Sequence, residues 1–551
     1  MDPHPFAIAK NVGVPQAELV IHGTVLTVDD SQPTAEAMAV VDGRIAAVGS
    51  RADIEPLIGP DTEIVDIGDG CVLPGLIEAH GHPLMEAIAL SDRLVDIRPV
   101  TIPDADDVVA AIRAEVAKRG VDGAYLNGWD PLLQNGLPEP TLDWLNGIAP
   151  ETPLVITHNS GHKAFFNSAA AAKSGLTRET PDPKGAKYGR DASGELDGTA
   201  EESAAVFSVL AGAIKPTDYP AMLLAEAARL NRAGLTTCSE MAFDPMFRPV
   251  LDQLRDQLTV RLRTYEMSTE KMSTDATLDN GDDAIRQVGI KIWVDGSPWI
   301  GNIDLSFPYL DTDATRAIGV VPGSCGHANY TKEQLTEIVE AYFPLGWQMA
   351  CHVQGDRGVD TILDVYEEAL TKHPRDDHRL RLEHVGAITD EQLRRAADLG
   401  VTCSIFVDQI HYWGDIIVDG LFGPEHGSRW MPCGSAVATG MRISLHNDPP
   451  VTPEEPLRNI SVAASRIAPS GRVLGPEERI TVEQAIRAQT IDAAWQLFSD
   501  DVIGSLEVGK YADFVVLSAD PRSVPPERIA DLDVRATYLA GKKVFDELLS
   551  A

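Results

Sequence analysis

Short runs of apolar and β-branched residues recur through the middle of the chain, and a stretch with helical spacing usually follows each run. Strands that alternate with helices pair in parallel, and eight such units close into a barrel. The pattern therefore predicts an α/β fold of the (β/α)8, TIM-like type. Its eight expected strands are VLPGLIEAH, LTTCSEMA, TVRLRTYEM, VGIKIWVDG, WQMACHVQG, LRLEHVGA, VTCSIFVDQ and RISLHNDPP.

Several of the intervening helices carry a start signal. Thr331, Thr389 and Thr481 each stand three residues before a glutamine, which is the spacing of a capping box. After the first of these, Leu335 and Val339 belong to a set of apolar residues at helical spacing. We expect this apolar face to pack against the barrel.

The two ends of the chain have a different pattern, in which apolar and polar residues alternate between Gly-containing turns. The first 70 residues include AELVIHGTVLTV and EAMAVVDGRIAAVG, and the last 50 include ADFVVLS and VRATYLAGKKVFD. Such alternation is typical of small antiparallel sheets. We predict that residues 1–70 and 499–551 together build one β-domain.

The gap between the first two barrel runs is much too long for a loop between a strand and a helix. It contains strand-like AYLNGWD and PLVITHNSGH, followed by the helical AMLLAEAARLNRAG. We predict an inserted α+β subdomain over residues 96–230. The first barrel strand then falls in 71–95, and strands two to eight fall in 231–498.

Composition and charge narrow the choice of partners. The chain has 83 acidic and 46 basic residues, a formal net charge of -37, which disfavours nucleic acid and anionic membranes. The six cysteines form no C-x-x-C pair, and no run reaches the roughly 18 apolar residues of a membrane span. The opening residues lack the basic and apolar segments of a signal peptide. We therefore expect a soluble cytoplasmic protein that acts on a small molecule.

Candidate metal ligands follow the predicted strands. His80 and His82 stand two apart at the end of the first run, so both imidazoles face the barrel mouth, although such a pair alone could be structural. Catalytic residues of barrel enzymes sit at strand ends, and four more candidates close predicted strands. They are Lys291, His352, His384 and Asp448. Four histidines, a lysine and an aspartate are what a two-metal hydrolase needs.

The joint pattern resembles the amidohydrolase superfamily, and within it the YtcJ-like branch (amidohydrolase family 3) that includes N-substituted formamide deformylases. The resemblance covers nearly the whole chain and implies a barrel with a bipartite β-sandwich built from both termini. One departure is Glu78, where the family opening more commonly has aspartate. The matching segments are VDGRIAAVG, VLPGLIEAHGH, KIWVDGS, HVQGDRGVD, LEHVGAI and IGSLEVGKYADFVVLSADP.

The resemblance also implies roles for the six candidates. His80 and His82 are ligands of a buried metal ion, and His352 and His384 are ligands of an outer one. Lys291 is a carboxylated bridge; the alternative is a plain lysine that forms a hydrogen bond near a single metal. Asp448 binds metal, takes a proton from water and returns it to the leaving nitrogen.

Three further residues are candidate substrate contacts. His162 lies in the insertion and resembles a family position near the substrate, so it could hold a carbonyl oxygen or simply pack. Trp293 is in phase with Lys291 and should share its face. His446 stands two residues before Asp448 and faces the barrel interior, where it either forms a hydrogen bond to Asp448 or fills space.

These features predict a metal-dependent hydrolase that uses metal-activated water to cleave a non-peptide C–N bond, with a linear amide or formamide favoured by the resemblance alone. The alternatives are a deaminase of a heterocycle, a lactone or ester hydrolase on the same site, and a metal-free scaffold protein. Zinc is expected by prevalence, as one or two ions, although the ligands also suit manganese, iron or nickel. A homodimer stays an open expectation.

Overall fold

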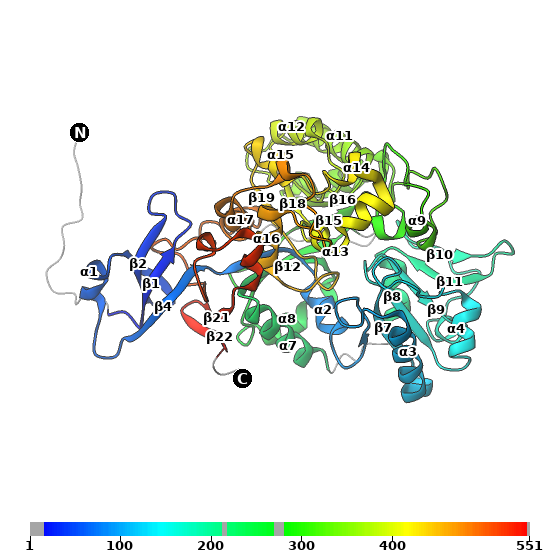
Figure 1. Ribbon diagram of the computed structural model, residues 1–551, viewed down its shortest axis with the longest axis horizontal. Helices are drawn as coiled ribbons and strands as arrows, with labels where there is room; N and C mark the ends of the chain where they lie inside the picture. Colours follow the sequence, from blue (N-terminus) through cyan, green and yellow to red (C-terminus); the bar gives the residue numbers. More distant parts are fainter. Residues whose placement is uncertain (1–15, 212–217, 269–279, 548–551) are drawn as a thin grey trace.

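A computed structural model describes residues 16–211, 218–268 and 280–547 in three sheets (Figure 1). The first 15 positions of the predicted β-domain lie outside the described residues, as do 212–217, 269–279 and 548–551. Among the described residues, no helix has the length and apolar character that crossing a membrane would require. All six cysteines are free thiols, and only Cys325 is partly exposed.

The central sheet contains eight parallel strands, which are hydrogen-bonded to one another in chain order. The first and the last of these strands are in contact, so the barrel is nearly closed. Each strand overlaps one of the eight predicted runs, which confirms the TIM-like barrel. The strands are β5 (Leu76–Gly81), β12 (Leu235–Phe243), β13 (Arg261–Met267), β15 (Ile285–Trp293), β16 (Gln348–Val353), β17 (Arg381–His384), β18 (Thr402–Ile405) and β19 (Ile443–Leu445). The short β14 (Asn280–Gly281) pairs antiparallel with β15.

Helices surround the barrel, and the three expected capping boxes are present at Thr331, Thr389 and Thr481. Leu335 and Val339 are fully buried, as the apolar face predicts. The main helices are α7 (Tyr219–Arg232), α8 (Arg248–Leu254), α10 (Lys332–Tyr342), α11 (Asp356–Lys372), α12 (Asp390–Asp398), α13 (Gln409–Ile416), α15 (Cys433–Ala438), α16 (Pro456–Ser465), α17 (Val482–Ala488) and α18 (Ile491–Gln496).

Both ends of the chain contribute to one seven-stranded sheet, whose blue and red strands lie side by side in Figure 1. Strand β4 joins the two parts, because it pairs antiparallel with β20. The sheet is mixed rather than purely antiparallel, since the connection through α1 (Arg51–Ile54) lets β1 and β4 run in parallel. In order, the strands are β22 (Lys542–Asp546), β21 (Val534–Leu539), β20 (Phe514–Leu517), β4 (Glu63–Pro74), β1 (Leu19–Leu26), β2 (Thr34–Val41) and β3 (Arg44–Gly49).

The chain passes from this sheet into the barrel at Gly75. The VLP of the first predicted barrel run ends β4, and the barrel strand β5 begins at Leu76. A Cβ atom at Gly75 would lie 2.1 Å from Thr236 Oγ1, so only glycine fits this close crossing. The first barrel strand therefore starts later than the run VLPGLIEAH suggests.

The insertion forms a third sheet, which lies at the other end of the molecule from the terminal sheet (Figure 1). It has its own apolar core, including Val108, Leu126 and Leu154. Its strands are β10 (Lys187–Arg190), β11 (Leu196–Glu201), β9 (Lys163–Phe166), β8 (Leu154–His158), β7 (Ala124–Trp129) and β6 (Val95–Asp96). Its helices are α3 (Ala105–Arg119), α4 (Leu142–Ile148), α5 (Ser168–Lys173) and α6 (Ser203–Leu210).

Candidate metal centre

Six side chains at the carboxyl ends of the barrel strands line one pocket of about 110 Å³. They are the six residues that the sequence analysis selected as metal ligands: His80, His82, Lys291, His352, His384 and Asp448. They come from the ends of β5, β15, β16 and β17, and from the loop after β19. The barrel therefore gathers side chains that are up to 368 positions apart (448 minus 80).

His80, His82 and Asp448 form a compact group of donor atoms. Asp448 Oδ1 lies 3.6 Å from His80 Nε2 and 3.3 Å from His82 Nε2. This oxygen is buried, and it accepts no hydrogen bond from the described part of the chain. Ligands about 2.0–2.2 Å from a tetrahedral zinc ion lie roughly 3.3–3.6 Å apart. The two nitrogens and the unpartnered oxygen therefore fit a divalent metal ion.

Carboxylates hold the far sides of both imidazoles. His80 Nδ1 lies 2.6 Å from Glu383 Oε2, and Arg381 Nε lies 2.9 Å from the other oxygen of Glu383. His82 Nδ1 lies 3.5 Å from Glu240 Oε1. A carboxylate that accepts the Nδ1 hydrogen leaves the Nε2 lone pair free for a metal. In this arrangement the Nε2 atoms of both histidines are available to a metal ion.

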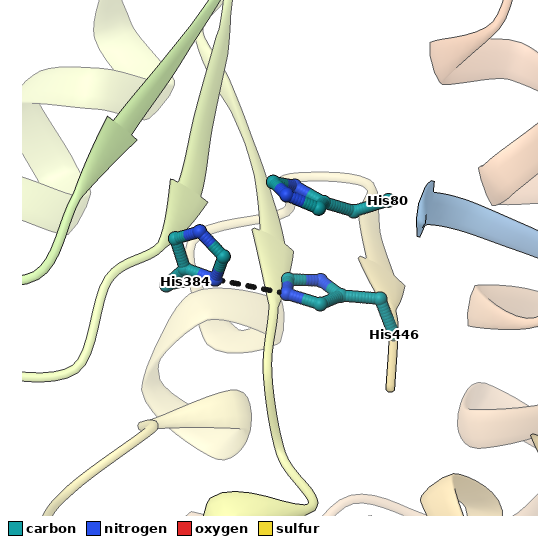
Figure 2. A group of neighbouring side chains, drawn as sticks. All are labelled: His80, His384 and His446. Atoms are coloured by element: carbon teal, nitrogen blue, oxygen red, sulfur yellow. Dashed lines mark hydrogen bonds between the residues drawn. The ribbon is translucent and has the colours of Figure 1, made fainter. Parts of the chain in front are cut away.

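His80 and His384 form a second group with His446 (Figure 2). The rings of His446 and His80 stack with centroids 4.6 Å apart, and His446 Nε2 lies 3.1 Å from His384 Nδ1. His446 is fully buried and is not among the described residues that line the pocket. Its two ring nitrogens contact Ser404 and His384 rather than Asp448, and a contact with substrate stays a prediction.

A line of hydrogen bonds continues from His446 into the barrel. His446 Nδ1 lies 2.8 Å from Ser404 Oγ, which lies 2.8 Å from Ser444 Oγ. Ser444 donates to Gln496 Oε1 at 2.6 Å, and the Gln496 amide nitrogen donates to two acceptors of β18. Gln496 Oε1 can only accept a hydrogen bond. The hydrogens of His446 Nδ1, Ser404 and Ser444 can therefore all point along the line toward Gln496. His446 Nε2 then accepts from His384 Nδ1, and His384 Nε2 keeps its lone pair.

Lys291 and His352 complete the set of six side chains at the carboxyl ends of the barrel strands, which we call the rim. Lys291 Nζ lies 3.1 Å from His80 Nε2, and burial lowers the pKa of Lys291 to about 8. His352 Nε2 donates to the carbonyl of Gly296 at 2.7 Å, which leaves Nδ1 as its ligand atom. The ring centroids of His352 and His384 are 4.3 Å apart. Within the described ranges, His352 belongs to neither of the two compact groups.

His82 and Asp448 are a close pair of oppositely charged side chains at the rim. Burial alone would lower the pKa of His82, but Asp448 and Glu240 raise it to about 9. Burial alone would raise the pKa of Asp448, but the charged imidazole of His82, whose Nε2 lies 3.3 Å from Oδ1, holds it below its usual value. Without metal, His82 and Asp448 thus form an ion pair, which a cation would replace.

The insertion closes the pocket from the other side. His162 Nδ1 lies 2.8 Å from Glu202 Oε2, and the other oxygen of Glu202 accepts from Asn302 at 2.7 Å. The ring of His162 lies 4.9 Å from the ring of His352, and both residues line the pocket. Trp293 lines it as well, with its ring centroid 5.6 Å from Lys291 Nζ. The structure thus brings His162 and Trp293, but not His446, to the pocket surface.

Apolar side chains line the same pocket as the candidate metal ligands. Leu94 follows α2 (Pro83–Ala89), while Val206, Phe207 and Leu210 belong to α6. A substrate in this pocket can therefore contact apolar side chains from the insertion and from the segment after β5. These side chains favour a substrate with an apolar substituent.

Sequence reasoning missed the residues behind the ligands. Arg381 and Glu383 alternate on β17 and face the interior, which strand periodicity could have indicated. By the same alternation His384 would face outward. Its φ of 71° ends the strand and turns the ring toward the pocket, a change that no pattern in the sequence signals.

Comparisons with known proteins agree with this geometry. The sequence profile of the Amidohydrolase family matches residues 63–545. The chain is 28% identical to Protein LONG AFTER FAR-RED 3 of Arabidopsis thaliana, over 98% of this chain and 93% of that protein. It is 27% identical to N-substituted formamide deformylase of Arthrobacter pascens, over 95% of this chain and 97% of that protein. An uncharacterized metal-dependent hydrolase from Pyrococcus horikoshii shares the fold, with a TM-score of 0.72 and 21% identity. The match covers 92% of this chain and 99% of that chain.

Proposed function

Because this chain belongs to the amidohydrolase family and is a hydrolase that acts on carbon–nitrogen bonds, we propose that it hydrolyses a small linear amide, with an N-substituted formamide favoured. The observation that carries the proposal is the pocket itself. Its lining combines Oδ1 of Asp448 and two imidazole nitrogens with the apolar side chains Leu94, Val206, Phe207 and Leu210. The name of the Arthrobacter pascens relative supports the choice of formamide.

The proposed metal ligands are divided between two positions. His80, His82 and Asp448 would hold one ion, and His352 and His384 the other. When bound, the metal supplies a Lewis acid that polarises the substrate carbonyl and lowers the pKa of water. Zinc is proposed because imidazole and carboxylate suit it, and because the spacing of the first group fits tetrahedral bonds.

Asp448 is the proposed proton carrier. Its pKa is lower than that of an ordinary aspartate, so the side chain is a carboxylate at neutral pH and can accept a proton from water. The protonated Asp448 then donates to the nitrogen of the breaking bond, which leaves as an amine. His162, held through Nδ1 by Glu202, is proposed to donate from its other nitrogen to the carbonyl oxygen.

Lys291 is the proposed carboxylated bridge. Burial lowers its pKa to about 8, so a sizeable fraction of the side chain is a neutral amine near neutral pH. The neutral Nζ can attack the carbon of CO2, form an N–C bond and release one proton to solvent. The resulting anion would replace an ammonium beside cations. The alternative is a plain Lys291 that donates to His80.

The proposed location is the cytoplasm, because five of the six free cysteines are buried and no pairing is formed among the described residues. The proposed partner is the small-molecule substrate alone.

A substrate panel tests the proposal. Zinc-loaded and manganese-loaded enzyme would be assayed with formamides that carry an apolar group on nitrogen, and with acyl-amides, cyclic amides, aminopurines and esters. We expect formate and a primary amine as products, with the highest kcat/KM for formamides that carry an apolar group. Ammonia from a heterocycle would replace the proposal with a deaminase, and alcohol release would replace it with an esterase. Protein that binds no metal would favour the scaffold alternative.

A further inference from the structure

A second group of ligand atoms lies outside the pocket, where three carboxylates converge. Glu86 is on α2, Glu226 is on α7, and Glu454 is in the loop after β19. One oxygen of each lies within 4.8 Å of the others. Glu86 is fully buried, Glu226 is 1% exposed, and Glu454 is half-buried. We call this group the three-glutamate cluster.

The buried oxygens of the cluster lack partners. Both oxygens of Glu86 are buried without a hydrogen-bond donor anywhere in the described chain, and so are Glu226 Oε1 and Glu454 Oε1. The fully buried Glu78 is different, because its two oxygens accept from the backbone amides of His80 and Asn447. Buried carboxylates normally find such donors, so the orphaned pair on Glu86 indicates a missing ligand.

Nearby arginines do not fill the gap. Arg229 contacts only Glu226 Oε2, the oxygen outside the orphaned set. Arg98 donates to both oxygens of Asp96 and to the carbonyl of Pro450. Burial, and then the charges of the neighbouring glutamates, raise the pKa values of Glu86 and Glu226 well above the usual range. The cluster therefore needs either protons or a cation.

We propose that the three-glutamate cluster is a second cation site, separate from the catalytic centre, and that it binds a hard divalent cation, Ca²⁺. Its three ligand atoms are all carboxylate oxygens, and no imidazole or thiol joins the group among the described residues. Oxygen ligands select calcium over zinc. Calcium bonds of 2.3–2.6 Å place opposite ligands roughly 5 Å apart, which suits the observed spacing. Water completes the coordination.

The site has a route to solvent. Glu454 also lines a surface cleft of about 470 Å³. The lining of this cleft has four carboxylates, Glu454, Glu455, Asp533 and Glu547, and two guanidinium groups, Arg232 and Arg458. Because carboxylates outnumber guanidinium groups in this lining, a cation can enter the cleft and pass to Glu454, while Glu86 and Glu226 stay buried. This arrangement explains why one ligand is half-exposed and two are not.

The cluster connects the segments that carry catalytic ligands. Glu86 lies one helical turn after His82, and Glu454 lies six residues after Asp448. Glu226 provides the third anchor from α7, which packs against α2. A bound Ca²⁺ would therefore fix two of the segments that shape the rim, and it would stabilise the protein without touching substrate.

The test measures calcium binding by the full-length, zinc-saturated protein at pH 7 with equilibrium dialysis. We expect one Ca²⁺ per chain for the wild type. The double variant Glu86→Gln/Glu226→Gln should lose at least a hundredfold in Ca²⁺ affinity, because it removes two of three anionic ligands. The matched control Asp533→Asn lines the same cleft outside the cluster and should bind as the wild type does. Calcium should raise the melting temperature of the wild type and the control only.

Three results would overturn the site. They are a wild type that binds no Ca²⁺, a double variant that binds it normally, and a control that loses it as the double variant does. If the double variant fails to fold, Glu454→Gln replaces it, since that side chain is half-exposed. The single variant should weaken Ca²⁺ binding at least tenfold, and unchanged binding would refute the proposal. Because the readout is calcium binding, the result does not depend on finding the substrate.

Discussion

The barrel interior has two levels with similar residues and opposite character. On the floor, Arg381 donates to the Tyr265 hydroxyl at 2.9 Å and to the Ala79 carbonyl at 3.0 Å, and Tyr265 donates to Gln348 at 2.6 Å. At the rim, one oxygen of Asp448 accepts no hydrogen bond from the described residues. On the floor, the contacts of Arg381 and Tyr265 join barrel strands to one another and so stabilise the fold, whereas the donor atoms that converge around Asp448 at the rim mark a binding site.

The two levels meet at Glu383. Its Oε2 accepts a hydrogen bond from Arg381 Nη2 on the floor at 3.0 Å and contacts His80 Nδ1 at the rim. The same side chain is therefore a structural ion pair on one side and a support for a ligand on the other. Substitutions on the floor and at the rim can show whether stability and metal binding depend on the same side chains.

The largest effect is expected at the rim, from Asp448→Asn. The amide cannot accept the proton of water, so kcat/KM should fall on the order of 10²–10⁴-fold. The remaining ligands should keep zinc bound, as measured by metal analysis of the dialysed protein. Asp533→Asn serves as a surface control. Full activity in Asp448→Asn would remove this residue from the proposed proton transfer.

The next effect is expected on the floor. Arg381→Met leaves Glu383 buried without its cation, which should lower the free energy of unfolding by about 3–5 kcal/mol. The urea midpoint of zinc-loaded protein measures the loss. Arg381→Met/Glu383→Leu should recover most of the stability while zinc binds more weakly, because His80 loses its carboxylate. If the double variant binds zinc as tightly as the wild type, the floor does not support the rim.

A smaller effect is expected behind the rim, at His446. His446→Leu removes the acceptor of the His384 Nδ1 hydrogen, so zinc affinity should fall roughly 10–100-fold. His446→Gln supplies another acceptor and should retain more of the affinity, while Ser404→Ala should have a weaker effect. Competition with a chromogenic chelator measures all three. Equal affinity for the leucine and wild-type proteins would reduce His446 to packing.

The smallest effect concerns pH. Only neutral Lys291 can react with CO2, and its pKa of about 8 makes the neutral fraction rise with pH through that value. Metal-free enzyme given zinc at fixed CO2 pressure should therefore be activated about tenfold faster at pH 9 than at pH 7. Reactions without CO2 provide the control. Equal rates at both pH values, or equal rates without CO2, would leave Lys291 a plain amine.

The barrel and its rim could be predicted because periodicity reports strands, and barrels place their chemistry at strand ends. Strand periodicity and position at a strand end were enough to predict that His80 and Lys291 face the pocket. The support shell was less accessible, because Arg381 and Glu383 look like any charged pair until burial is known. His384 points inward only through its positive φ, and the three-glutamate cluster draws on three segments without a shared pattern.

The pairing of β4 with β20 has a consequence for biosynthesis. Pro74 lies opposite Phe514, so an early strand must wait for a partner made about 440 residues later (514 minus 74). At typical translation rates of about 5–20 residues per second, this strand edge stays open for tens of seconds on the ribosome. During that interval the nascent chain presents an unpaired edge, and the need for chaperones should be greatest there.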